Sequence, residues 1–94
     1  MSACVIGHIE VKDQAKWSEY RSKVPATLVE WGGEVIFRGR RGRVFSGEHS
    51  HSDTVVIRFS DASSAEGWYD SAAYQALIPL REQAADLVLI CFEA

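Results

Sequence analysis

Two ionisable side chains inside otherwise apolar strands are the first candidates for chemistry. His8 lies in the apolar stretch Ala3–Ile9, and Arg58 lies in Val55–Phe59. Ionisable groups are rare in central strands unless they are paired or functional. Imidazole titrates near neutral pH, so His8 is the candidate proton acceptor of a cleft. The structural alternative for His8 is a core histidine satisfied by a carbonyl or by Glu10. Arg58 is interpreted as a structural counter-ion, with the binding of a ligand carboxylate as its functional alternative.

Aromatic side chains at helical spacing form the second candidate group. Each tyrosine hydroxyl needs a hydrogen-bond partner when it is buried. A pocket that is lined by aromatic rings, with hydroxyl groups facing into it, suits a small organic ligand. An arginine about two helical turns after the last tyrosine can supply a positive charge. The alternative is that the aromatic residues are simply core. The predicted ligand-binding residues are Tyr20, Trp68, Tyr69, Ser71, Tyr74 and Arg81.

Three further groups give weaker signals. The His-x-His pair lacks a third ligand, and two isolated thiols are too few for a metal, so no metal site is predicted. In a reducing compartment both thiols are expected to be buried and reduced, near one another if the first and last strands pair. The arginine-rich loop is expected to be a solvated surface. These residues are His49 and His51, Cys4 and Cys91, and Arg38, Arg40, Arg41 and Arg43.

Size and composition indicate one small globular domain covering residues 1–94. Hydrophobic residues make up 47% of the 94 residues, which excludes a disordered tail, and the formal charge of −3 gives no reason to expect nucleic acid. The start of the chain lacks the pattern of a signal peptide, and no run is long enough to span a membrane. We therefore expect a cytoplasmic protein without membrane contact. No dinucleotide, nucleotide-hydrolysis or serine-hydrolase motif is present, and no cofactor is predicted.

The elements that must position these residues follow the order β-α-β-β-α-β. The strands are Ala3–Ile9, Val35–Phe37, Val55–Phe59 and Leu87–Phe92, with Val44-Phe45 as a short extra strand. Asp13 is expected to begin the first helix and Gly32-Gly33 to end it, whereas Ser60-Asp61 and Ser71 are expected to cap the later helical segments. Both helices are expected to kink or break at their prolines, Pro25 and Pro79. This order predicts an α+β ferredoxin-like plait, a four-stranded antiparallel sheet with both helices on one face.

The strands are apolar on both faces, although the helices can cover only one. A strand with one buried face should alternate apolar and polar residues. The simplest cover for the second face is another copy of the chain, so we expect a homodimer through the sheet. Whether His8 and Arg58 share a face is left open by the sequence.

The chain resembles the domain-of-unknown-function 1330 family of the dimeric α/β-barrel superfamily over nearly its whole length. The resemblance depends on Ile6-Gly7-His8-Ile9-Glu10-Val11, on Tyr20-Arg21 with Lys23-Val24-Pro25-Ala26-Thr27, on Gly32-Gly33, on Trp68-Tyr69-Asp70-Ser71, and on Tyr74-Gln75-Ala76-Leu77 with Pro79-Leu80-Arg81. It implies a ferredoxin-like subunit that dimerises through its sheet, and no established activity. Ala72 replaces the family's usual proline, Arg58 stands where an acidic residue is more usual, and the arginine-rich loop is peculiar to this chain.

Three interpretations of function follow. The first is a homodimeric small-molecule-binding protein whose pocket includes His8 and the aromatic residues, with cofactor-independent oxidation or isomerisation as the reactions to test. The second is a non-catalytic ligand-binding or protein-interaction module, in which the aromatics are core. The third is an RNA-binding plait, which ranks last because the strands lack an exposed aromatic platform.

Overall fold

In a computed structural model that describes residues 2–94, four strands form one antiparallel sheet in the order β2-β3-β1-β4. The two strands that are central in space, β1 and β3, carry His8 and Arg58. This confirms the expected ferredoxin-like plait and its β-α-β-β-α-β order, with the second helical segment divided into three short helices. The elements are β1 (Ala3–Val11), α1 (Gln14–Leu28), the 3₁₀ turn η1 (Val29–Trp31), β2 (Glu34–Arg40), β3 (Asp53–Phe59), α2 (Ala62–Asp70), α3 (Ala72–Gln75), α4 (Ile78–Ala84) and β4 (Ala85–Glu93).

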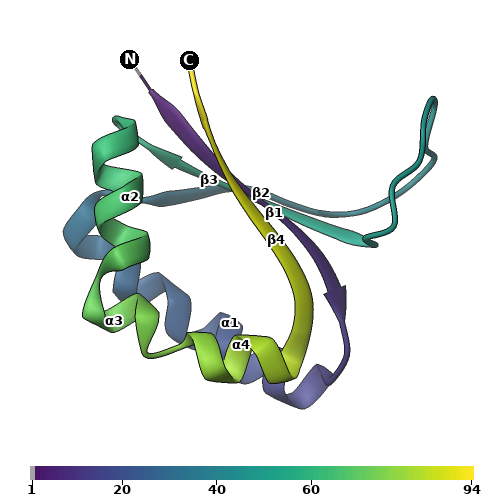
Figure 1. The fold of residues 1–94 in the computed structure, drawn as a ribbon, viewed down its shortest axis with the longest axis horizontal. Helices are drawn as coiled ribbons and strands as arrows, with labels where there is room; N and C mark the ends of the chain where they lie inside the picture. Colours follow the sequence, from purple (N-terminus) through teal and green to yellow (C-terminus); the bar gives the residue numbers. More distant parts are fainter. Residues whose placement is uncertain (1) are drawn as a thin grey trace.

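All the helices lie on one face of the sheet, as Figure 1 shows. Along β1 the residues that face the helices alternate with residues that face away, and the first set is buried. Trp68, Tyr74 and Phe59 are the largest fully buried side chains of this core, and each is at most 1% exposed. The hydrophobic core therefore fills the single layer between helices and sheet.

Side chains at the helix ends explain where the helices begin. The Asp13 carboxylate accepts a hydrogen bond from the Lys16 amide. In the same way, the side chains of Asp61 and Ser71 each accept a hydrogen bond from the backbone amide three residues further along the chain. The first helical region ends at Gly32, whose φ of +68° is the left-handed conformation that glycine adopts without strain. The predicted caps and stop are thus confirmed.

Two local predictions are wrong. Helix α1 continues through Pro25 to Leu28 without a break. Pro25 and Arg21 are both exposed, so water can satisfy the carbonyl that loses its amide partner. The break predicted at Pro79 is confirmed, because helical structure is interrupted between α3 and α4 and Pro79 lies in the first turn of α4, where a missing amide hydrogen costs nothing. Val44-Phe45 forms no strand, because it lies in the projecting loop between β2 and β3 (Figure 1) with no neighbouring strand to pair with.

The face of the sheet away from the helices, which we call the open face, is largely apolar. Register and alternation place on it Cys4 and Ile6 of β1, Phe37 of β2, Val56 of β3, and Val88, Ile90 and Phe92 of β4. Phe37 is 56% exposed and Phe92 is 50% exposed. None of the helices within residues 2–94 combines the length and hydrophobicity that a membrane span requires.

Candidate functional site

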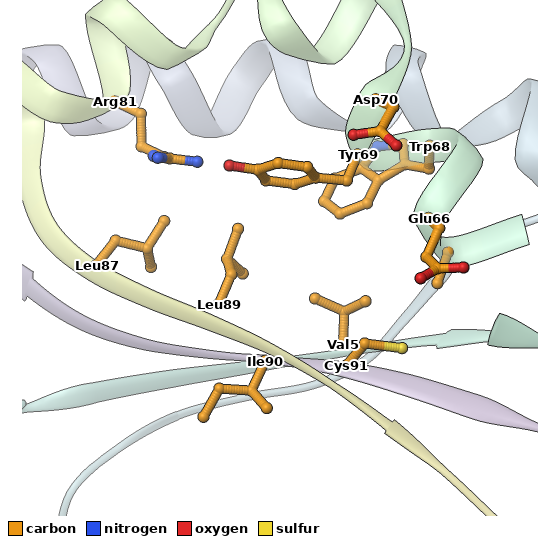
Figure 2. Close-up of a pocket in the computed structure, with 11 residues that line it drawn as sticks. Val5, Glu66, Trp68, Tyr69, Asp70, Arg81, Leu87, Leu89, Ile90 and Cys91 are labelled. Carbon is orange, nitrogen blue, oxygen red and sulfur yellow. The ribbon is translucent and has the colours of Figure 1, made fainter. Parts of the chain in front are cut away.

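A cavity of about 430 Å³ lies between α2, α4 and the edge strand β4 (Figure 2), and we call it the β4 cavity. Its floor is apolar, because Leu87 and Leu89 of β4 and Val5 of β1 point from the sheet toward the helices. Its opposite wall carries the rings of Trp68 and Tyr69 from α2. The remaining lining residues are Ala65, Glu66, Asp70, Arg81, Ile90 and Cys91.

The two ends of the β4 cavity carry opposite charges. At one end the Arg81 guanidinium and the Tyr69 hydroxyl point toward one another, and at the other lie the carboxylates of Glu66 and Asp70 (Figure 2). None of the ion pairs within residues 2–94 involves Arg81. The cavity therefore offers a cation next to an aromatic ring and an apolar floor, an arrangement that suits an organic molecule with a polar oxygen at one end.

Two buried tyrosines position Arg81 from the side of the core. Its Nη1 donates a hydrogen bond to the Tyr74 hydroxyl at 3.1 Å, and that hydroxyl lies 2.7 Å from the Tyr20 hydroxyl. Burial lowers the pKa of Arg81, but its hydrogen bond to Tyr74 and the proximity of the Tyr69 hydroxyl outweigh this effect and raise the pKa overall. Burial, and then the proximity of Tyr74, raises the pKa of Tyr20. Arg81 is thus a fixed positive charge, and the buried Tyr20 hydroxyl stays protonated.

Removing the Tyr74 hydroxyl should destabilise the fold. Tyr74→Phe leaves the buried Tyr20 hydroxyl without a partner and takes an acceptor from Arg81, and leaving a buried polar group unsatisfied costs about 1–3 kcal/mol. Urea unfolding should therefore show a loss in this range. Tyr69→Phe is the matched control, because its half-buried hydroxyl faces the cavity, and it should cost less. Equal losses for the two variants would contradict the assigned roles.

The structure separates the residues that the sequence grouped into one pocket. Trp68, Tyr69 and Arg81 line the β4 cavity. Tyr20 and Tyr74 do not line it, since they are 6% and 0% exposed and pack as core behind Arg81. Ser71 is the N-cap of α3, where its hydroxyl accepts a hydrogen bond from the Tyr74 amide.

The placement of His8 in the same pocket is wrong. Val5 lines the cavity, and His8, an odd number of residues further along the same strand, points to the opposite face. There its Nδ1 lies 3.2 Å from the Thr54 hydroxyl. Arg58 shares this open face, because Cys4 is its partner in the pairing of β1 and β3, and its guanidinium lies 3.7 Å from Glu34. Within one subunit the sheet therefore separates the imidazole of His8 from Arg81.

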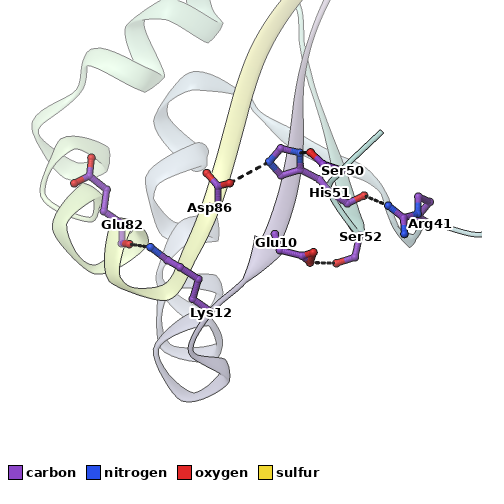
Figure 3. A network of polar contacts seen from close by, with 8 residues as sticks. All are labelled: Glu10, Lys12, Arg41, Ser50, His51, Ser52, Glu82 and Asp86. Atoms are coloured by element: carbon purple, nitrogen blue, oxygen red, sulfur yellow. Dashed lines mark hydrogen bonds and ion pairs between the residues drawn. The ribbon is translucent and has the colours of Figure 1, made fainter. Parts of the chain in front are cut away.

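His8 belongs to a histidine cluster at one end of the open face. Its ring meets that of His49 edge to face, with centroids 4.8 Å apart, and the His49 and His51 rings are 5.9 Å apart. His51 Nε2 lies 3.6 Å from Asp86 (Figure 3). Burial, and then the charges of His49 and His51, lower the pKa of His8, so its imidazole is neutral at pH 7. No group of three or more ligating side chains within residues 2–94 is arranged to hold a metal ion.

The two cysteines lie on neighbouring strands but not together. Cys91 pairs with Val5 and lines the β4 cavity, whereas Cys4 pairs with Phe92 on the open face. Both thiols are free, but Cys91 is exposed rather than buried. Burial and then the carboxylate of Glu93 raise the pKa of Cys91, so the cavity thiol is protonated at neutral pH and is a poor nucleophile.

Sequence reasoning missed the cavity floor and its acidic end. Leu87 and Leu89 occupy alternate positions of β4, and Glu66 and Asp70 are four residues apart on one helix. Both spacings place residues on a common face and are visible in the sequence. The missing information was that these two faces oppose each other.

The model of the domain of unknown function DUF1330 matches residues 2–94. The chain belongs to the DUF1330 family. No curated protein matches the sequence.

Solved structures agree with the fold. A protein of unknown function from Rhodopseudomonas palustris matches with a TM-score of 0.82 at 11% identity, over 99% of this chain and 82% of that chain. A dimeric ferredoxin-like protein of unknown function from Jannaschia sp. CCS1 matches with a TM-score of 0.78 at 10% identity, over 100% of both chains. SnoaB, a cofactor-independent oxygenase from Streptomyces nogalater, matches with a TM-score of 0.71 at 8% identity, over 99% of this chain and 92% of that chain. At these identities the likeness establishes the fold that this DUF1330 member shares with them.

Proposed function

We propose that the protein is a homodimer that binds a small, oxygen-bearing organic molecule in the β4 cavity of each subunit. The observation that carries the proposal is the placement of Arg81, a cation with no carboxylate partner among residues 2–94, at the polar end of an apolar cavity of about 430 Å³. The volume falls within the range of about 300–1,000 Å³ that is common for ligand pockets.

The shape of the cavity suggests how such a ligand lies. Its apolar part fits between the Tyr69 ring and the side chains of Leu87 and Leu89, and its oxygen meets Arg81. A guanidinium recognises a carboxylate or another oxyanion through charge-assisted hydrogen bonds. Glu66 and Asp70 at the far end disfavour a second negative charge there, so the proposed ligand is a monoanion or a neutral carbonyl compound.

The test uses benzoate as a probe of defined chemistry. Two-dimensional NMR titration of the intact protein should shift the resonances of Tyr69 and Leu89. Loss of a hydrogen bond to a charged group costs about 1.5–3 kcal/mol, so Arg81→Gln should weaken binding by roughly ten- to hundredfold. Arg43→Gln, a change in the exposed loop, is the control and should bind as the wild type does. Shifts outside the cavity, or equal affinity of Arg81→Gln and wild type, would contradict the proposal.

The dimer in this proposal is supported by the open face. About half of the Phe37 and Phe92 surface is exposed there beside five further apolar side chains of the same face. Isolated apolar residues are normal on a surface, but a contiguous apolar sheet face marks an interface. A second copy of the chain presents the same complementary surface, as an isologous contact requires. The Jannaschia protein of similar fold is itself described as dimeric.

Turnover is the second candidate, favoured by the similarity in fold to the oxygenase SnoaB. In this version Arg81 stabilises negative charge that develops on a substrate oxygen during cofactor-independent oxidation or isomerisation. His8 cannot act as the base in the cavity of its own subunit, because it lies on the other face of the sheet. A His8→Ala variant with unchanged turnover of a substrate would remove His8 from the mechanism.

The non-catalytic module remains the alternative to this version. Tyr20 and Tyr74 are packed as core, as that interpretation expects, whereas the adjacent cavity favours a ligand. If benzoate binds, and if none of a series of other bound compounds is chemically changed, a binding module would be favoured.

A further inference from the structure

A second concave region, at the opposite edge of the sheet from the β4 cavity, gathers arginines from two elements. We call it the arginine groove. It has a volume of about 260 Å³ and lies between α1 and the strands β2 and β3. Its lining residues are Ile9, Trp17, Arg21, Arg38, Gly39, Arg40, Asp53 and Thr54.

Strand alternation and helix packing bring the arginines together. Arg38 and Arg40 are two residues apart on β2, so their side chains leave the sheet on the same face. The partner of Arg38 in the sheet is Val55, which is buried beneath the helices, so this is the helix-covered face. Arg21 comes from α1, which packs on that face. The floor beneath them is formed by Ile9 and Trp17, which are 1% and 5% exposed.

The positive charge of the groove is only partly compensated. Three guanidinium groups line it with one carboxylate, that of Asp53. The ion pairs within residues 2–94 join other residues, and none involves Arg21, Arg38 or Arg40. Burial, and then the positive charge of Arg21, lower the pKa of Arg38. The chain thus holds like charges near one another in a partly desolvated position, although it carries 13 acidic residues that could have neutralised them.

We propose that the arginine groove binds the oxyanion group of a small molecule, a carboxylate or a phosphate. A guanidinium is planar, always charged and weakly hydrated, and it matches both groups through paired hydrogen bonds. Arginines from a helix and a strand can approach one oxyanion from two directions, which a single exposed arginine cannot do. An anion there relieves the repulsion between Arg21 and Arg38.

The arginine groove is distinct from the β4 cavity and from the open face, because none of its lining residues lines the cavity or is among the apolar residues of the open face. The buried Tyr20 lies between the two concave regions, since Arg38 of the groove and Arg81 of the cavity both act on its pKa. Because the arginines project from the helix-covered face, a second copy seated on the open face leaves them accessible. If the benzoate experiment with the Arg81 variant fails, this inference is therefore unaffected. If the anion titration of the arginine groove fails, the proposal for the β4 cavity is likewise unaffected.

The test is an NMR titration of the intact protein with inorganic phosphate, with acetate and with chloride at constant ionic strength. We expect saturable shifts of the backbone amides of residues 21, 38 and 40 and of the Trp17 indole N–H with phosphate, acetate or both, and none that saturate with chloride. Saturation by phosphate alone identifies a phosphate site, and saturation by acetate alone identifies a carboxylate site. Shifts that grow linearly with every anion alike would overturn the proposal, since they report screening only.

Two variants at different positions, with one control, make the result specific. Arg38→Gln and Arg21→Gln should each weaken binding of the saturating anion at least tenfold. Both residues are exposed, and the amide spectrum of each variant reports directly whether the fold is retained. Arg43→Gln, which removes one positive charge from the neighbouring loop, should leave the affinity unchanged within a factor of two. Equal weakening by Arg43→Gln would show that net charge alone attracts the anion, and would overturn the proposal.

Discussion

Replacing Ile6 by lysine is expected to dissociate the proposed homodimer into monomers. Ile6 lies at the middle of the open face, where its neighbours on the adjacent strands are Val56 and Ile90. An uncompensated charge at the centre of an apolar interface costs several kcal/mol, so the dissociation constant should rise by a factor of 100 or more. Sedimentation velocity at micromolar concentration should show a single-chain species.

The matched control for Ile6→Lys is Val29→Lys. Val29 is an exposed apolar residue too, with 80% of its surface accessible, but it lies in η1, outside the sheet. This variant should sediment as the wild type does. Ile6 is partly exposed in one subunit, so the lysine can extend into water and the subunit stays folded. A folded Ile6→Lys protein that still sediments as two chains would place the interface elsewhere.

Trp68→Ala is expected to cause the largest loss of stability. The Trp68 side chain is 1% exposed, its ring packs against Tyr74 at 4.4 Å between centroids, and its indole donates a hydrogen bond to the Thr27 hydroxyl at 2.9 Å. Truncating a buried tryptophan to alanine costs about 3–5 kcal/mol. That is a large part of the 5–15 kcal/mol that stabilises an ordinary domain.

Urea unfolding at a fixed protein concentration measures the effect of Trp68→Ala, because association contributes to the apparent stability. Trp68→Phe keeps a ring in the core and loses mainly the hydrogen bond. The Thr27 hydroxyl retains its bond to the Val24 carbonyl, so this variant should cost clearly less than alanine. A loss below about 1 kcal/mol for Trp68→Ala would mean that the packing around α2 is not as tight as described.

Much of the fold follows from local sequence patterns, because strands and caps are local. The unbroken apolar runs located all four strands, and every strand extends beyond its run by at least one residue. In β2 these added residues include Arg38 and Arg40, which an apolar pattern cannot indicate. Asp13, Asp61 and Ser71 gave the helix starts because a capping side chain acts within three residues of its position.

The site was predicted less well, because it depends on which face of a strand points to the helices. A shift of one residue exchanges the two faces, and β1 is apolar on both, so its pattern could not assign His8. The positions of ionisable residues did not indicate the face that carries the site either, since His8 and Arg58 lie on the open face while Arg81 lies in the cavity. The predicted aromatic ligand-binding residues also do not all line the cavity. Tyr69 and Tyr74 lie in the successive helices α2 and α3, and Tyr69 lines the cavity whereas Tyr74 packs in the core.

The most direct test of the central claim, that a second copy covers the open face of the sheet, is native mass spectrometry of the wild-type protein at low micromolar concentration. The account predicts a two-chain species as the dominant ion series. A folded protein that appears as a single chain at this concentration would contradict it, because the apolar surface around Ile6, Ile90 and Phe92 would then be stable in water.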